Sequence, residues 1–186
     1  MGPYKHNYNS TLLQDCKYGL ILVRPTCFET RPQNQPKMEI WQGCLAKEEG
    51  NKNKMLWKNL ALNYEHKGQI LARCNPICFF LKDDLYITGG FNRDGYSLTK
   101  MGNTFASCDR YNFVKEKFYH TRHCLPYHID KYTSSVIANM EETLVLIYTK
   151  ENDYLNNNNR QEKLIIFTEK RGFEDISYIF STTLQL

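Results

Sequence analysis

The chain has 186 residues and a mass of 22.0 kDa, with 41% hydrophobic and 24% charged residues. This composition is that of an ordinary globular domain, and it argues against wholesale disorder. The formal net charge is only +4, and the 24 Lys and Arg residues are scattered along the sequence. Nucleic-acid-binding proteins gather such charge on one face, so we expect no nucleic-acid partner.

The predicted location is the cytoplasm. No apolar run approaches the roughly 20 residues that cross a bilayer, and the first residues lack the apolar segment of a secretory signal. Seven cysteines form an odd, irregularly spaced set. Such a set is typical of free thiols in a reducing compartment rather than of a disulfide scaffold. Because no apolar run is long enough to cross a bilayer, we expect no membrane partner.

Short apolar runs dominate the sequence after a loose N-terminus. Residues 1–10 are predicted to be disordered, and residues 11–186 to form the folded part. The apolar runs come in pairs joined by short polar turns, which is the pattern of a β-hairpin. Three such pairs occur in chain order: 11–13 with 20–23, 77–81 with 85–88, and 135–138 with 144–147.

Each predicted hairpin is followed by two further strand-like segments. An apolar strand comes first, and then a segment with an aromatic residue: Trp57, Phe118 or Phe173. The second strand of the hairpin recurs 65 and then 59 positions along the chain, from Leu20 to Leu85 to Leu144. A repeated unit of four strands is the content of one propeller blade. The sequence therefore predicts an all-β fold, a partial β-propeller of about three four-stranded blades at 11–62, 76–120 and 133–180.

The middle unit is similar to a kelch repeat. Its second strand ends in Gly89-Gly90, and Tyr111 is followed seven residues later by Phe118. The kelch pattern has a hydrophobic strand ending in two glycines, then a Tyr and, seven residues on, a Trp, which Phe118 replaces here. The resemblance covers residues 73–127. In the first and third units other residues stand where the glycines belong.

The resemblance implies a non-catalytic protein-interaction module. Many kelch proteins join a BTB domain and a BACK segment to a propeller that captures substrates for a cullin-3 ubiquitin ligase. These 186 residues contain no BTB portion, through which alone cullin-3 would be bound. The chain is therefore interpreted as the substrate-recognition part of a BTB-kelch adaptor. The alternative is an actin-binding or cytoskeletal scaffold protein, and a propeller enzyme is a third possibility.

Site residues follow from the same resemblance. In peptide-binding kelch proteins, the loop after the glycine pair and the links between blades share one face and supply Arg, Ser, Asn and Tyr contacts. We expect accessible arginines to grip a carboxylate or phosphate, so an acidic peptide is the predicted ligand. Carried over by position, the protein-binding candidates are Arg73, Asn92, Arg93, Tyr96, Arg122 and Lys131.

One cluster contains residues that could bind a metal or take part in catalysis: His120-Thr-Arg-His123-Cys124-Leu-Pro-Tyr-His128. Imidazole and thiolate are zinc ligands, but this spacing matches no common zinc module. The stretch is expected to be a polar linking loop between blades. No arrangement of nucleophile, base and orienting group is visible, so we predict no enzyme, no metal and no cofactor.

Three blades are too few for a closed ring, since propellers have about four to eight. An incomplete ring leaves blade faces uncovered, and exposed apolar faces favour association. We expect either a fragment or isoform of a longer protein, which we prefer, or a ring that partner chains complete. The isolated chain is predicted to be poorly soluble or oligomeric.

Overall fold

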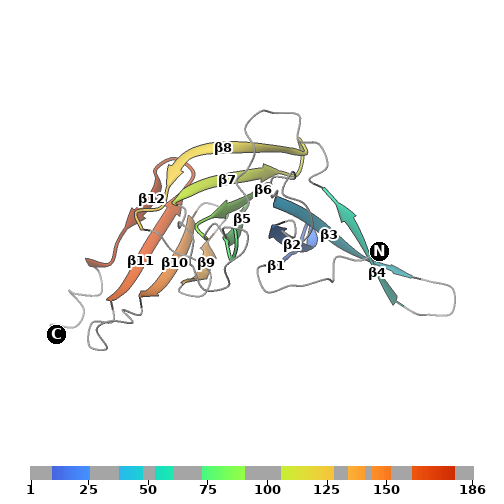
Figure 1. Cartoon of the computed structure of the whole chain (residues 1–186), viewed down its shortest axis with the longest axis horizontal. Coiled ribbons are helices and arrows are strands. Elements are labelled where there is room, and N and C mark those ends of the chain that lie inside the picture. Colours follow the sequence, from blue (N-terminus) through green and yellow to red (C-terminus); the bar gives the residue numbers. More distant parts are fainter. Residues whose placement is uncertain are drawn as a thin grey trace, which may run out of the picture.

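The computed structural model describes residues 10–25, 38–47, 53–60, 73–90, 106–127, 134–140, 144–151 and 161–178. The predicted disorder of residues 1–10 therefore falls almost entirely outside the described residues. Within them the chain forms twelve β-strands (Figure 1). The strands are β1 (Thr11–Asp15), β2 (Gly19–Pro25), β3 (Met38–Lys47), β4 (Asn53–Asn59), β5 (Ile77–Leu81), β6 (Asp84–Thr88), β7 (Ser107–Asn112), β8 (Lys117–Cys124), β9 (Ser134–Met140), β10 (Leu144–Glu151), β11 (Gln161–Thr168) and β12 (Gly172–Asp175).

The strands form three antiparallel sheets of four, each made from four consecutive strands: β1 to β4, β5 to β8 and β9 to β12. All three predicted hairpins are confirmed, because β1 pairs with β2, β5 with β6, and β9 with β10. Trp57, Phe118 and Phe173 each lie on the fourth strand of their sheet. Every repeated unit of the sequence thus folds as one sheet.

The three sheets are successive blades of a partial β-propeller. The first strands, β1, β5 and β9, lie beside one another, and the fourth strands lie on the outside of the fan (Figure 1). Burial follows the same order within the middle sheet. Every residue of β5 and β6 is buried, whereas β8 alternates between exposed and half-buried residues. The all-β partial propeller predicted from the sequence is therefore the observed architecture.

Two details of the repeat differ from the sequence prediction. The register pairs Leu81 with Asp84 in the middle hairpin but Met140 with Leu144 in the third, whose turn is one residue longer. The structural counterpart of Leu85 is therefore Val145 and not Leu144. In addition, the middle sheet continues through Cys124 and does not end at residue 120.

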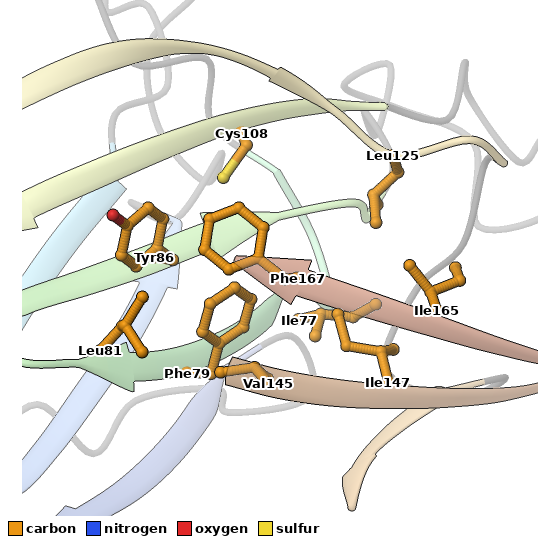
Figure 2. Packing of buried hydrophobic residues seen from close by; sticks show 10 residues of the cluster. All are labelled: Ile77, Phe79, Leu81, Tyr86, Cys108, Leu125, Val145, Ile147, Ile165 and Phe167. Atoms are coloured by element: carbon orange, nitrogen blue, oxygen red, sulfur yellow. The ribbon is translucent and has the colours of Figure 1, made fainter. Parts of the chain in front are cut away.

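The middle sheet is packed on both faces because its side chains alternate in direction. Leu85 and Ile87 point toward the first sheet, where they join Ile21 and Val23 in one apolar cluster. Tyr86 and its register partner Phe79 point toward the third sheet. Their rings meet Phe167 of β11 at centroid distances of 5.2 and 4.9 Å (Figure 2). Two inter-sheet cores therefore fix the three blades relative to one another.

Candidate functional site

One end of the middle sheet gathers the points at which the predicted binding loops leave it. The start of β5, the end of β6, the start of β7 and the end of β8 lie side by side there. The register places Ile77 opposite Thr88, Thr88 opposite Cys108, and Ser107 opposite Cys124. We call this the loop end of the middle sheet. It brings together the two kinds of loop that the sequence analysis selected.

The glycine pair after β6 allows the chain to leave the sheet against a neighbouring segment. Gly89 and Gly90 are buried and have positive φ angles of 64° and 81°. A Cβ atom on Gly90 would lie 2.5 Å from the carbonyl oxygen of Cys74. Only glycine combines this backbone conformation with such a close approach. The pair is therefore a steric requirement at the loop end.

Arg73 joins the two ends of the loop that connects β6 and β7. Its Nη1 donates to the carbonyl oxygens of Gly89 at 3.3 Å and Ser107 at 2.7 Å. Its Nη2 donates to Ser107 Oγ at 3.1 Å and to Asp109 Oδ2 at 2.6 Å. One planar guanidinium thus holds both strand ends from which residues 91–105 extend.

The environment of Arg73 is the interior of the protein. Its side chain is fully buried, and Asp109 is buried beside it. Burial lowers the pKa of Arg73, since it disfavours the charged guanidinium, while the negative charge of Asp109 acts in the opposite direction. Four hydrogen bonds, of which the one to Asp109 is also an ion pair, offset the loss of hydration.

The expectation that Arg73 is an accessible partner contact is wrong. Its position in a link between blades indicated a surface residue, but the guanidinium turns inward to a carboxylate 36 positions along the chain. Pairing at that sequence distance depends on the register of β6 and β7, which the sequence alone does not give. Arg73 is a positioning residue for the loop.

Asp109 also connects this buried network to the surface. Its Oδ1 lies 2.6 Å from Nδ1 of His120 on β8, and the His120 side chain is 75% exposed. The two residues are partners in the β7–β8 register. A hydrogen bond to the carboxylate places a proton on Nδ1, so Nε2 is left to accept from or donate to other groups. Arg73, Asp109 and His120 form a continuous polar path from the interior to the rim.

Arg122 lies two residues beyond His120 on the same strand and is exposed. Both are in the part of β8 that approaches Leu125, whose amide donates to the carbonyl of Ala106 at 2.8 Å. Ala106 is the residue at which the β6–β7 loop returns. Arg122 is therefore an exposed cation near the loop end, as expected of a binding residue.

The expected linking loop at residues 120–124 is instead the last part of β8. The contacts of the two histidines divide the cluster between two faces, since His120 meets Asp109. His123 points the other way from His120, and its ring meets Phe167 at 5.5 Å. Within the described ranges there is no group of three His, Cys, Asp or Glu side chains placed to hold a metal ion. His128 lies outside these ranges.

The other predicted site residues are not described by the structure. Asn92, Arg93 and Tyr96 belong to 91–105, and Lys131 belongs to 128–133. The structure describes only the strand ends next to these segments.

Sequence reasoning missed Asp109 and Ser107, and it considered His120 only as a possible zinc ligand. A signal for Asp109 was present, because it lies two residues before the core residue Tyr111 in one strand. Side chains two apart on a strand share a face, so an acid at this position must be buried and must have a partner.

A second polar cluster lies at the opposite end of the sheets, between two hairpin turns. Lys17 Nζ lies 2.5 Å from Asp83 Oδ1, and the hydroxyl of Tyr18 donates to the same oxygen. The ring of Tyr18 stacks on Phe113 at 4.1 Å. This cluster connects the first blade to the second at the surface.

In the described part of the chain, no helix is long and apolar enough to cross a membrane.

Comparison with known proteins supports the fold. No protein-family model matches the sequence, and no curated protein matches it. Among solved structures, a similar one is titled "Structure of YjhT", with a TM-score of 0.55 and 9% sequence identity. The match covers 91% of this chain and 51% of the other, so the chain spans about half the length of YjhT. At this identity the likeness concerns the fold alone.

Proposed function

We propose that the chain is a non-catalytic protein-interaction module of the kelch type, and that it recognises an acidic peptide segment of a partner protein. The observation that carries the proposal is the construction of the loop end. Arg73 binds the strand ends on both sides of residues 91–105 from inside the protein. Arg122 and His120 are exposed on the neighbouring strand β8. A rigid base beneath variable loops is how β-scaffolds present binding residues.

Packing around the two kelch-type aromatics agrees with this proposal. Tyr111 and Phe118 are opposite each other in the β7–β8 register, and their rings meet edge to face at 4.9 Å. Phe118 therefore packs as the Trp of the kelch pattern is expected to pack. Gly89 and Gly90 follow β6 directly. The glycine pair, Tyr111 and Phe118 therefore all belong to one blade.

On the same proposal, the chain serves as the substrate-recognition part of a BTB-kelch adaptor for a cullin-3 ubiquitin ligase in the cytoplasm. The ligase would be reached through a BTB domain, and the propeller would select the substrate. Arginine suits this task because its planar fork binds a carboxylate through two hydrogen bonds.

The test is quantitative recovery of bound proteins from a reducing extract with the tagged 186-residue chain. Arg93→Ala and Arg122→Ala are compared with Arg171→Ala, an exposed arginine on the β11–β12 turn of the third sheet. We expect at least one acid-rich partner whose affinity falls about tenfold or more in the first two variants, as truncation of a binding arginine produces. The Arg171 variant should bind as wild type does.

Equal binding by all three variants would refute this location of the site. Sedimentation of the chain with filamentous actin, unaffected by Arg93→Ala and Arg122→Ala, would favour a cytoskeletal scaffold instead.

A further inference from the structure

Within the described residues, the first and third sheets each pack against another sheet on one side, and their outward faces are largely apolar. A sheet with one face in water normally alternates apolar and polar residues, whereas a strand buried on both faces reads as a continuous apolar run. β2 contains 20–23, Leu-Ile-Leu-Val, and β11 contains 164–167, Leu-Ile-Ile-Phe. These strands carry the pattern of sheets covered on both sides.

The first outer face is formed by the side chains of the first sheet that point away from the middle sheet: Leu12, Leu22, Trp41, Leu45, Met55 and Trp57. Their direction follows from the register, since Leu22 pairs with Trp41, while the neighbouring Ile21 and Ile40 lie in the core. Leu12 is 60% exposed and Leu45 is 71% exposed. Leu22 on the same face is only 6% exposed, so the accessible apolar surface lies mainly around Leu12 and Leu45.

Two polar side chains on the first outer face, Arg24 and Trp41, bind Glu39 of the same face. Arg24 Nε donates to Glu39 Oε2 at 2.7 Å, and Trp41 Nε1 donates to the same oxygen at 3.0 Å. The guanidinium also lies 5.6 Å from the Trp41 ring. The opposite charges offset each other, so covering this surface requires no new ion pair.

The second outer face belongs to the third sheet and is formed by Leu146, Tyr148, Leu164 and Ile166. Leu146 pairs with Ile166, and Tyr148 pairs with Leu164. Residues of the other parity, Val145, Ile147, Ile165 and Phe167, are buried against the middle sheet. All four side chains of the second outer face are half-buried.

The internal repeat shows what each outer face should contact. Leu22 occupies the position of Ile87 in the middle sheet and of Ile147 in the third, counted from the hairpin registers. Ile87 packs against the preceding sheet, and so does Ile147. The first outer face therefore corresponds to the side on which a preceding sheet sits. By the same count, the second outer face is the side on which a following sheet sits.

We infer that two copies of this chain close one ring, with the first outer face of each packed on the second outer face of the other. The chain spans 51% of YjhT, a solved structure of the same fold, so two copies together match the length of that structure. The two faces differ, so their contact is heterologous, and a twofold axis closes it after two chains. Both contacts repeat the sheet-to-sheet order found inside the chain. This inference is independent of the proposed function.

The primary test is the mass of the purified 186-residue chain by sedimentation and light scattering. We expect a single species of twice the 22.0 kDa chain mass. A monomer of 22.0 kDa, or a continuous series of larger assemblies from a contact that does not close, would overturn the inference.

Two substitutions of opposite charge identify the faces. Leu12→Glu on the first outer face and Ile166→Lys on the second should each give monomers, because both interfaces of the dimer then contain a buried charge. Leu45→Glu and Tyr148→Lys repeat the test at other positions of the same faces. Val114→Glu is the control, since Val114 is 69% exposed on the β7–β8 turn and belongs to neither face.

Mixing separates a heterologous contact from a symmetric one. In an equimolar mixture of Leu12→Glu and Ile166→Lys, one interface of the mixed dimer is wild type and the other brings the two opposite charges together. We expect the mixture to recover the dimer mass. Monomers in the mixture, with circular dichroism showing each variant folded, would rule out the heterologous ring.

Discussion

Arg73 and Asp109 form an ion pair inside the middle blade, with Nη2 and Oδ2 2.6 Å apart and both side chains buried. Asp109 in turn reaches the exposed ring of His120. The pair does more than neutralise two charges, because Arg73 also binds the carbonyl oxygens on both sides of the β6–β7 loop. Arg73 thereby joins the two strand ends on either side of residues 91–105.

Removing the Arg73 guanidinium should destabilise the fold strongly. Arg73→Ala leaves the Asp109 carboxylate buried without its main cation, and breaking a buried pair from one side costs about 3–5 kcal/mol. Urea unfolding followed by circular dichroism measures the loss. Arg122→Ala is the matched control, because an exposed arginine should change stability by no more than about 0.5 kcal/mol. Equal stability of the two variants would contradict the structural role of Arg73.

Adding one methyl group at Gly90 should also be costly. The alanine side chain would face the Cys74 carbonyl oxygen at 2.5 Å from a backbone with φ of +81°. Strain of this kind costs about 1–3 kcal/mol, and the clash adds to it. Gly19→Ala is the control, since its φ is similar at +76° but its nearest atom, the Gly43 oxygen, is 3.2 Å away. A smaller loss for Gly90→Ala than for Gly19→Ala in urea unfolding would count against this packing.

Cysteine reactivity should divide sharply between surface and interior. Burial raises the pKa of Cys108 to about 12, so almost no thiolate exists at neutral pH. Cys16, Cys44 and Cys124 are exposed. Brief alkylation of the native protein, mapped by mass spectrometry, should label these three well before Cys108. In urea Cys108 should react as they do, and rapid native labelling of Cys108 would show that the β7–β8 region opens.

The contact between the first two hairpin turns should depend on pH. Hydrogen bonds from Lys17 and then Tyr18 lower the pKa of Asp83 below its ordinary value. A carboxyl group whose pKa is lower in the folded state stabilises the fold above its unfolded pKa, and this contribution is lost as the pH falls through the folded pKa. Wild type should therefore unfold at a higher urea concentration than Asp83→Asn at pH 7.

That difference should shrink as the pH falls below about 4, where free aspartate is protonated. Because Lys17 and Asp83 are exposed, added salt should also reduce it. Lys17→Met provides the second arm of a double-mutant cycle. A difference between wild type and Asp83→Asn that stays constant from pH 7 to acid would show that the carboxylate charge is not involved.

The sequence alone determined the blades. Paired apolar runs around short polar turns, repeated three times with an aromatic residue at the end, specify which residues enter each sheet. These signals are local, since hairpin register depends on alternation and turn length over a few residues. The counterpart of Leu85 was misplaced by one residue only because the third turn is one residue longer.

Only the tertiary structure decided the character of the site. Arg73 reads as a surface residue in a link, and His120 and His123 read as neighbours in one loop. The fold buries the first against Asp109 and places the other two on opposite faces of β8. Such outcomes depend on pairings dozens of residues apart and on which face of a strand meets another blade. The physical reason is that a charge in the interior is tolerated only where register brings its partner within hydrogen-bonding distance.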